Sequence, residues 1–234
     1  MAVLLAAAAI GYFVFFRSNI FHKPSMKNTS DFNAQIIKLP EPRYKSKISL
    51  ERALLKRRSI REYRNEPLSL AEISQLLWSA QGITDAKLGS RTAPSAGAMY
   101  PLEIYVVAGN IDGLAAGVYK HKPNEHELQR IAEGDKRDEL YELALGQSWI
   151  KDAPAVIIFC AVFERTTGKY GERGIRYVYM EAGHAAQNVY LQAVTLGLGT
   201  VTVGAFEDEG VKKLLQLGEK EQSLYLMPVG KSKQ

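Results

Sequence analysis

The chain carries Arg57-Arg58-Ser59-Ile60-Arg61 and, further along, Ala93-Pro94-Ser95-Ala96-Gly97-Ala98-Met99-Tyr100-Pro101. The first stretch places three guanidinium groups and a hydroxyl within five residues, a set of donors that suits a phosphate monoester. The second is a run of small residues between two prolines, where backbone can approach a flat ligand closely. Together they indicate a phosphate-tailed aromatic cofactor, and flavin mononucleotide (FMN) is the candidate.

Each stretch also has a purely structural interpretation. Cations suit the carboxyl end of a helix, so Arg57–Arg61 is also consistent with a solvated helix end. The residues Pro94-Ser95-Ala96-Gly97 are consistent with a tight turn before a strand. A nucleophilic role for Ser95 is disfavoured, because the Gly-x-Ser-x-Gly elbow is missing.

The composition is that of a globular protein with one substantial core: 234 residues, 46% hydrophobic and 24% charged. The net charge of +5 is below that of a dedicated nucleic-acid binder, so no nucleic-acid partner is expected. Much of the excess is local, in Arg17, Lys23, Lys27, Lys38, Arg43, Lys45 and Lys47. Binding to anionic lipid explains this basic stretch more simply than binding to nucleic acid does. The single cysteine, Cys160, excludes an intramolecular disulfide and is predicted to be buried.

Residues 1–21 are predicted to be an N-terminal membrane anchor. Ala2–Phe16 carries no charge, and as a helix it spans roughly 22 Å, which extension through Phe21 would lengthen toward a bilayer core of about 30 Å. An uncleaved signal-like segment is the competing interpretation, but Phe15-Phe16-Arg17-Ser18 is a poor cleavage site. The positive charges that follow place the body of the protein on the cytoplasmic side, with export as the alternative.

Residues 22–47 are predicted to be a basic linker without regular structure, since Pro24, Pro40 and Pro42 interrupt it. Residues 48–232 read as one domain. Its predicted helices cover 49–56, 69–81 (with a Ser69/Glu72 capping box), 137–145, 177–195 and 211–215. Its predicted strands cover 103–108, 117–120, 127–131, 155–162, 200–203 and 224–227, of which 155–162 is the most apolar and therefore central. This irregular mixture indicates an α+β sandwich.

The spacing of the glycines and histidines disfavours two other kinds of site, a dinucleotide-binding turn and a metal site. The glycines of Gly197–Gly204 follow a helix and precede a strand, the reverse of a dinucleotide-binding turn. None of His22, His121, His126 and His184 has metal-ligand spacing, so no metal site is expected. No catalytic side chain stands out either, as expected where a flavin carries the chemistry.

The sequence resembles the nitroreductase-like flavoproteins. Arg57–Tyr63 matches their Arg-Arg-Ser-x-Arg-x-aromatic entry, and Thr92–Glu103 is similar to the SagB/ThcOx-type dehydrogenase branch. Lys169–Arg173, Glu181–Asn188, Gly197–Phe206 and Leu226–Lys231 also match, in the family's order. Ala98 and Tyr100 depart from the broader pattern, where an asparagine and a glutamine are common.

The resemblance implies a nitroreductase-like sandwich with a central mixed, mainly antiparallel sheet flanked by helices, in an interlocked homodimer with FMN at the subunit interface. The implied cofactor-binding residues are Arg57, Arg58, Ser59, Arg61, Gly230 and Lys231 for the phosphate side, Pro94, Ser95, Ala96 and Gly97 from the partner subunit, and Gly204 and Ala205 near the flavin N5 edge.

The implied activity is ping-pong hydride transfer from NAD(P)H, through FMN, to an electron-poor small molecule of the nitroaromatic or quinone type. One alternative is a SagB-type azoline dehydrogenase that acts on a modified peptide beside a partner enzyme. A second alternative is a non-enzymatic, membrane-tethered basic binding module. That module has no need of Pro94–Gly97 or Gly204, which disfavours it.

Overall fold

The structure, a computed structural model, describes residues 35–233 of the chain. The expected anchor over 1–21 and the first part of the expected linker lie outside the described residues. Among the residues that are described, no helix combines the length and the apolar character needed to cross a membrane.

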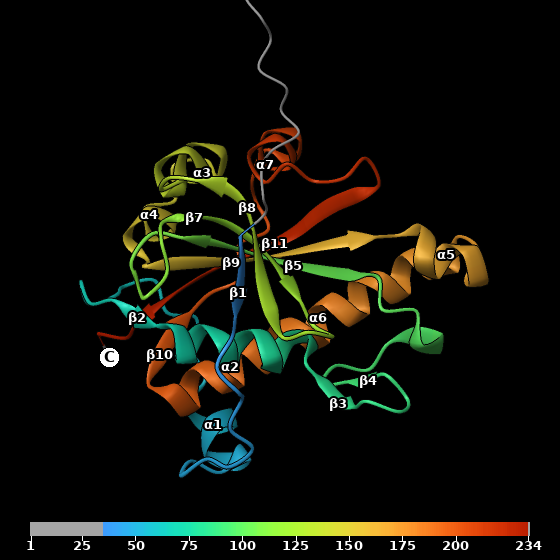
Figure 1. Cartoon of the computed structure of the whole chain (residues 1–234), viewed down its shortest axis with the longest axis horizontal. Coiled ribbons are helices and arrows are strands. Elements are labelled where there is room, and N and C mark those ends of the chain that lie inside the picture. The colour runs from blue at the N-terminus through green and yellow to red at the C-terminus, as the bar shows by residue number, and fades with distance from the viewer. Residues whose placement is uncertain (1–34, 234) are drawn as a thin grey trace, which may run out of the picture. The chain divides into compact units, whose positions relative to one another are not determined.

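Helices and strands follow one another without strict alternation (Figure 1). The helices are α1 (Leu50–Lys56), α2 (Leu70–Gln81), α3 (Arg137–Leu143), α4 (Trp149–Asp152), α5 (Glu164–Tyr170), α6 (Arg173–Leu196) and α7 (Asp208–Leu214), with a 3-10 turn, η1, at Ala96–Ala98. The strands are β1 (Ile36–Lys38), β2 (Leu68–Ser69), β3 (Ile83–Asp85), β4 (Ser90–Arg91), β5 (Leu102–Ala108), β6 (Ile111–Asp112), β7 (Gly117–Lys122), β8 (Glu127–Glu133), β9 (Ala155–Val162), β10 (Leu198–Thr200) and β11 (Glu221–Lys231).

Seven strands form one sheet in the order β1-β8-β7-β5-β9-β11-β10, and every neighbouring pair in it is antiparallel. Strand β9 lies between β5 and β11 and is buried from Ala155 to Ala161, which confirms its predicted central position. Within residues 35–233, the single parallel pair is the short β2–β6 pair. The predicted α+β fold with a mainly antiparallel sheet is therefore confirmed.

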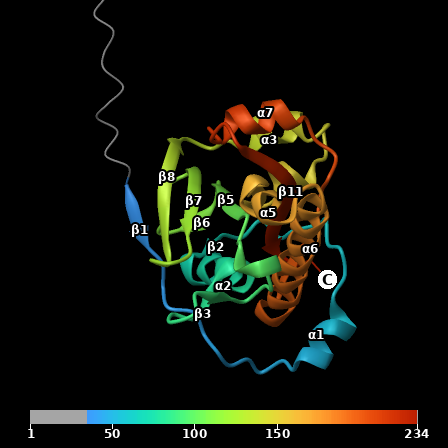
Figure 2. The ribbon, with the colours of Figure 1, turned by 90° about the vertical axis from the view of Figure 1, so that its right-hand side faces the viewer.

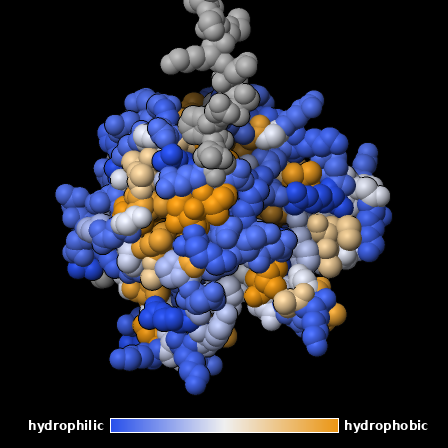
Figure 3. Space-filling view, in the orientation of Figure 1, coloured by the Kyte–Doolittle hydropathy of each residue, from blue (hydrophilic) through white to orange (hydrophobic). Residues whose placement is uncertain are grey.

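Helices cover both faces of this sheet (Figures 1 and 2). Successive strand residues point to opposite faces, so Ile104 and Ile157 pack toward α2 and α6, whereas Tyr105 and Ile158 pack toward α3, α4 and α7. The surface seen in Figure 3 is mostly hydrophilic, and its hydrophobic side chains gather in separate patches.

The two helices on the first face form as predicted. Ser69 and Glu72 make the reciprocal capping box of α2, with Ser69 N–H donating to Glu72 Oε2 at 2.9 Å. Helix α6 buries Ala182, Ala185 and its other small residues against α2, which allows close approach of the two helices. It ends at Gly197, whose φ of 72° lies in the left-handed region.

Some predicted boundaries were wrong. The strand expected over 200–203 ends at Thr200 as β10, because the Thr202 N–H donates to the Tyr190 hydroxyl rather than to a strand; only Val203 pairs again, with Leu226. The expected final strand over 224–227 is the longer β11. The helix expected to reach Leu145 ends at Leu143, since Leu145 has a φ of 57°.

In three further segments the structure contains more strand or helix than the sequence pattern predicted. Ile36–Lys38 lies in the predicted linker but forms β1, pairing with β8, and Leu39 is buried in the core. Pro40 does not prevent this, because it follows the strand. Helix α6 begins at Arg173, before the predicted Tyr177, and α7 begins at Asp208, before the predicted Val211.

Candidate functional site

The arginine segment leaves α1 and runs beside the ends of β10 and β11. Ile60 N–H donates to the carbonyl of Thr200 at 2.9 Å, and Arg64 N–H donates to the carbonyl of Lys231 at 2.9 Å. Gly199 permits this approach, because a Cβ atom there would lie 2.5 Å from the Ile60 side chain. The fold thus brings together three predicted segments that are far apart in the sequence.

The three guanidinium groups of this segment are available to an anion. Arg57 lies 5.3 Å over the Tyr190 ring and Arg61 lies 5.3 Å over the Trp149 ring. Arg58 is exposed and donates to the carbonyl of Arg57 at 2.7 Å. None of the three forms an ion pair with a carboxylate of residues 35–233.

Tyr190, on α6, connects the arginine segment to the strand end that leads to Gly204. Its hydroxyl accepts a hydrogen bond from Thr202 N–H at 2.8 Å and shares one with the Ser59 hydroxyl at 3.3 Å. The sequence pattern did not single out this residue, because the small and apolar residues of α6 account for the helix without it. The available signal was a tyrosine directly after the apolar residue Val189, which is buried on α6.

Replacing Tyr190 with phenylalanine is expected to lower the free energy of unfolding by about 1–2 kcal/mol, because the Thr202 amide loses its partner. Urea unfolding measures the effect, and hydrogen exchange should show faster exchange at Thr202. Tyr141→Phe is the matched control, since the Tyr141 hydroxyl makes no hydrogen bond within the described part of the chain. Equal stabilities of the two variants would contradict the connecting role.

A cavity of about 300 Å³ lies beside this cluster. Its lining includes Arg58, Ile60, Tyr190, Gly197, Thr200 and Ser232. These residues come from the arginine segment, the end of α6, β10 and the end of β11. A cavity of this volume suits part of a nucleotide cofactor, such as a phosphate and its polyol chain.

The two predicted residues at the end of β11 differ in their surroundings. Gly230 pairs with Gly199, and a Cβ atom on Gly230 would lie 2.8 Å from the Tyr63 ring. The Lys231 ammonium forms an ion pair with Glu72 at the start of α2. Burial alone would raise the pKa of the Glu72 carboxyl, but hydrogen bonds from Lys231 and Ser69 hold that pKa below its usual value. The charge of Lys231 is therefore already balanced.

Replacing Lys231 with methionine should lower the free energy of unfolding by about 1 kcal/mol, because Glu72 then keeps its charge without its cation. The loss should shrink when pH falls below the pKa of Glu72, where the carboxyl is protonated. Lys233→Met, at an exposed position two residues on, is the control and should match the unmodified chain at every pH. A pH-independent loss at Lys231 would contradict the ion-pair explanation.

The second predicted stretch forms a strained loop before β5. Gly97, Ala98 and Tyr100 have φ values of 60°, 56° and 45°, all in the left-handed region. A Cβ atom on Gly97 would lie 2.6 Å from the Tyr170 hydroxyl, so glycine is required by both conformation and space. Ser95 Oγ accepts from Tyr100 N–H at 2.9 Å, which closes the loop. Pro94 and Gly97 are exposed, and Ser95 and Ala96 are half-buried.

The two predicted stretches contact opposite sides of α6. Glu181 lies close to Ser95 in the loop, whereas Tyr190 hydrogen-bonds Ser59 in the arginine segment. Tyr190 follows Glu181 by nine positions, which places the two side chains about half a turn apart around the helix axis and roughly 13 Å apart along it. Within one chain, therefore, the structure does not bring the two stretches together.

The remaining predicted residues, Gly204 and Ala205, are exposed and follow the Val203–Leu226 bridge. The Ala205 carbonyl accepts from Gln147 Nε2 at 3.0 Å, and a Cβ atom on Gly204 would meet no neighbouring atom. His184 is exposed on α6. Across residues 35–233, no three His, Cys, Asp or Glu side chains are grouped so that they could hold a metal ion.

Known proteins are similar to this chain in sequence and in fold. The nitroreductase family pattern matches residues 54–231. MJ1384, a nitroreductase family protein of Methanocaldococcus jannaschii, is 53% identical over 184 residues, which are 79% of this chain and 91% of that protein. The crystal structure of a nitroreductase family protein from Ralstonia eutropha superposes with a TM-score of 0.75 at 29% identity, covering 85% of this chain and 90% of that one.

Two relatives are more distant. The microcin B17-processing protein McbC of Escherichia coli is 30% identical over 65% of this chain and 58% of its own length. The FMN reductase [NAD(P)H] of Bacillus subtilis is 26% identical over 66% of this chain and 53% of its own length. The expected resemblance to the nitroreductase-like flavoproteins is thus confirmed, with McbC as a more distant relative of the SagB type. The non-enzymatic alternative is set aside. The chain belongs to the nitroreductase family of oxidoreductases.

Proposed function

We propose that this protein is an FMN-dependent oxidoreductase that accepts hydride from NAD(P)H and passes it to an electron-poor small molecule of the nitroaromatic or quinone type. The observation that carries the proposal is the set of three guanidinium groups, on the segment beside the ends of β10 and β11, that form no ion pair with a carboxylate of residues 35–233. The B. subtilis relative, which is named for FMN and NAD(P)H, supports the choice of cofactor and reductant.

The residues present fit the phosphate and ribityl parts of FMN. Arg57, Arg58 and Arg61 supply charge without a competing carboxylate, and the Ser59 hydroxyl lies beside them. Gly204 and Ala205 are proposed to present exposed backbone to the flavin ring. Bound FMN supplies the hydride chemistry, so the protein needs to bind, orient and shield it rather than to provide a nucleophile.

We propose a smaller role for Lys231 in phosphate binding than the resemblance implies. Its ammonium is paired with Glu72, so phosphate contact would require that pair to rearrange. We therefore assign most of the phosphate binding to the arginine segment.

A second copy of the chain is proposed to complete each site. The loop Pro94–Gly97 contacts the opposite side of α6 from Tyr190, so it suits the flavin of a partner better than that of its own chain. Large hydrophobic side chains remain exposed on α1 and on the first half of α6: Leu50, Leu54, Leu55, Ile175, Tyr179 and Met180. Burial of this apolar surface in a homodimer would be favourable.

The second candidate function is oxidation of azolines in a modified peptide. The relation to McbC, which is named for processing of microcin B17, favours it. In this case the same flavin site would accept hydride from the peptide rather than from NAD(P)H.

The test is an absorbance titration of the purified chain. The main proposal predicts flavin absorbance bands that NADH or NADPH bleaches under anaerobic conditions and that a quinone such as menadione restores. Flavin that neither nicotinamide bleaches, but an azoline peptide does, would favour the second candidate. A colourless protein that FMN does not reconstitute would contradict both.

A further inference from the structure

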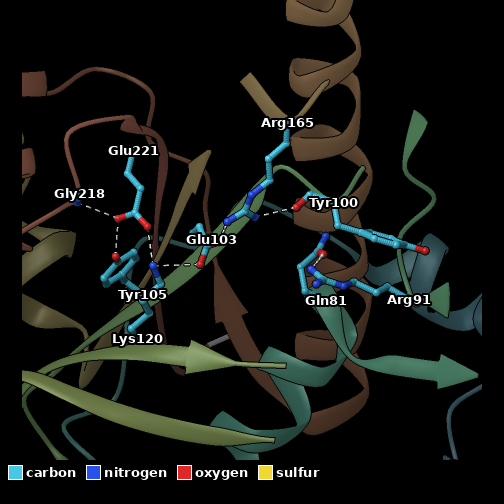
Figure 4. Close-up of polar contacts among 9 residues, drawn as sticks. All are labelled: Gln81, Arg91, Tyr100, Glu103, Tyr105, Lys120, Arg165, Gly218 and Glu221. Carbon is cyan, nitrogen blue, oxygen red and sulfur yellow. Dashed lines mark hydrogen bonds and ion pairs between the residues drawn. The ribbon is translucent and has the colours of Figure 1, made fainter. Parts of the chain in front are cut away.

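A second cavity, of about 340 Å³, lies among α2, β4, β5, β7 and α5. Its lining includes Gln81, Arg91, Glu103, Ile104, His121 and Arg165. Figure 4 shows Arg91 reaching toward Gln81, with the Tyr100 ring beside it and Arg165 above. None of these residues belongs to the arginine segment or to the cavity beside Tyr190.

His121 is the first feature that points to a ligand here. The side chain is 1% exposed, and neither ring nitrogen has a hydrogen-bond partner among residues 35–233. The His126 ring lies edge-on at 5.8 Å between centroids, which is a ring contact and not a hydrogen bond. Burial lowers the pKa of His121 to about 3, so the imidazole is neutral and carries one N–H donor. A buried donor without an acceptor is costly, and native structures rarely leave one.

Arg91 is the second feature. Its Nη1 donates to Gln81 Oε1 at 2.8 Å, and its guanidinium lies 4.5 Å over the Tyr100 ring. Its Nε is buried without a hydrogen-bond partner in the described part of the chain, and no described carboxylate pairs with the group. Arg91 therefore places a positive charge and a free N–H beside His121.

The nearby carboxylates do not neutralise this charge. Glu103 is committed to Lys120 at 3.0 Å and to Arg165 at 2.5 Å. Arg165 also donates to the carbonyl of Tyr100, as Figure 4 shows. Glu181 is buried, and this burial raises its pKa to about 7, so it is largely protonated below neutral pH. The cavity consequently has unmatched donors and an excess positive charge.

We propose that this cavity binds a small monocarboxylate, with the guanidinium of Arg91 as its charge partner and the His121 imidazole as a hydrogen-bond donor. A planar carboxylate matches the donor fork of arginine. Glu103 and Glu125 also line the cavity, and they disfavour a multiply charged anion such as phosphate. The proposal goes beyond the flavin site and does not depend on it.

Nuclear magnetic resonance of the histidine side chains tests this directly, since the chain has only four histidines. The purified full-length chain is titrated with sodium acetate, and with sodium chloride at equal ionic strength. We expect saturable acetate-dependent shifts of the His121 ring nitrogens, and no matching shifts with chloride or at His184. Arg91→Gln should weaken acetate binding about tenfold or more, through loss of a charge-assisted hydrogen bond.

The control variant is Lys122→Gln, which also removes one positive charge from the lining but no buried donor. It should change the acetate affinity by less than about twofold. Equal effects of the two variants, or shifts that chloride reproduces, would overturn the proposal in favour of a general charge effect. Should Arg91→Gln fail to fold, unsaturable acetate shifts in the unmodified chain would also overturn it.

Discussion

Replacing Arg57 and Arg61 together with alanine is expected to abolish FMN retention without unfolding the domain. Neither guanidinium forms an ion pair with the described residues, so their removal leaves no buried carboxylate behind. Each charge-assisted hydrogen bond to phosphate is worth about 1.5–3 kcal/mol, so losing two should weaken FMN binding by about 100-fold or more. Equilibrium dialysis against FMN measures the loss, and circular dichroism checks the fold.

Lys213→Ala with Lys220→Ala is the charge-matched control for this experiment. Both lysines are exposed, and they lie in or just after α7, on the opposite face of the sheet from α6. Their removal lowers the net charge equally, so it should leave FMN affinity nearly unchanged. A double arginine variant that keeps its flavin would show that the phosphate is bound elsewhere.

Protonation of Glu181 is expected to make the folded state more stable at low pH. Burial raises the pKa of its carboxyl from 4.5 to about 7, against the opposing contacts with Ser95, Arg91 and Gln81. Between these two values the folded chain keeps a proton that the unfolded chain releases, so this contribution is present below pH 4.5 and is lost as pH rises to about 7. The total loss is about 3 kcal/mol.

Glu181→Gln isolates this effect, because glutamine cannot titrate and retains hydrogen-bonding capacity. The comparison with the unmodified chain is needed because His121 acts in the opposite direction: its pKa is lowered to about 3, so it favours folding as pH rises toward 6.5. Urea unfolding across pH 4–8 should therefore show a stability difference between the two chains that changes with pH. A constant difference would mean that Glu181 ionises normally.

Much of the fold could be predicted because its signals are local. The capping box at Ser69, the apolar run of β9 and the hairpin of β7 and β8 each depend on neighbouring residues. The errors arose where distant partners decide the structure. β1 forms because β8 offers it an edge, and β10 stops at Thr200 because Tyr190 takes the amide of Thr202.

The candidate site could also be predicted only where its signals are local in the sequence. Motif spacing predicted the arginine segment as a binding segment, and the structure places this segment beside the ends of β10 and β11. The pairing of Lys231 with Glu72 joins residues 159 positions apart, which no local pattern reveals. Tyr190 was missed for a related reason, since its importance comes from Ser59 and Thr202 and not from its own helix.

Mixed dimers test most directly the central claim, that each flavin is held by the arginine segment of one copy and the Pro94–Gly97 loop of the other. One copy carries Arg57→Ala with Arg61→Ala, and the other carries Gly97→Val, which strains the loop. A homodimer made of either variant alone should bind no FMN. We expect the mixed dimer to bind one FMN, because one site then receives both defects and the other receives none. A mixed dimer without FMN would place both segments of each site in one chain and contradict a site shared between two copies.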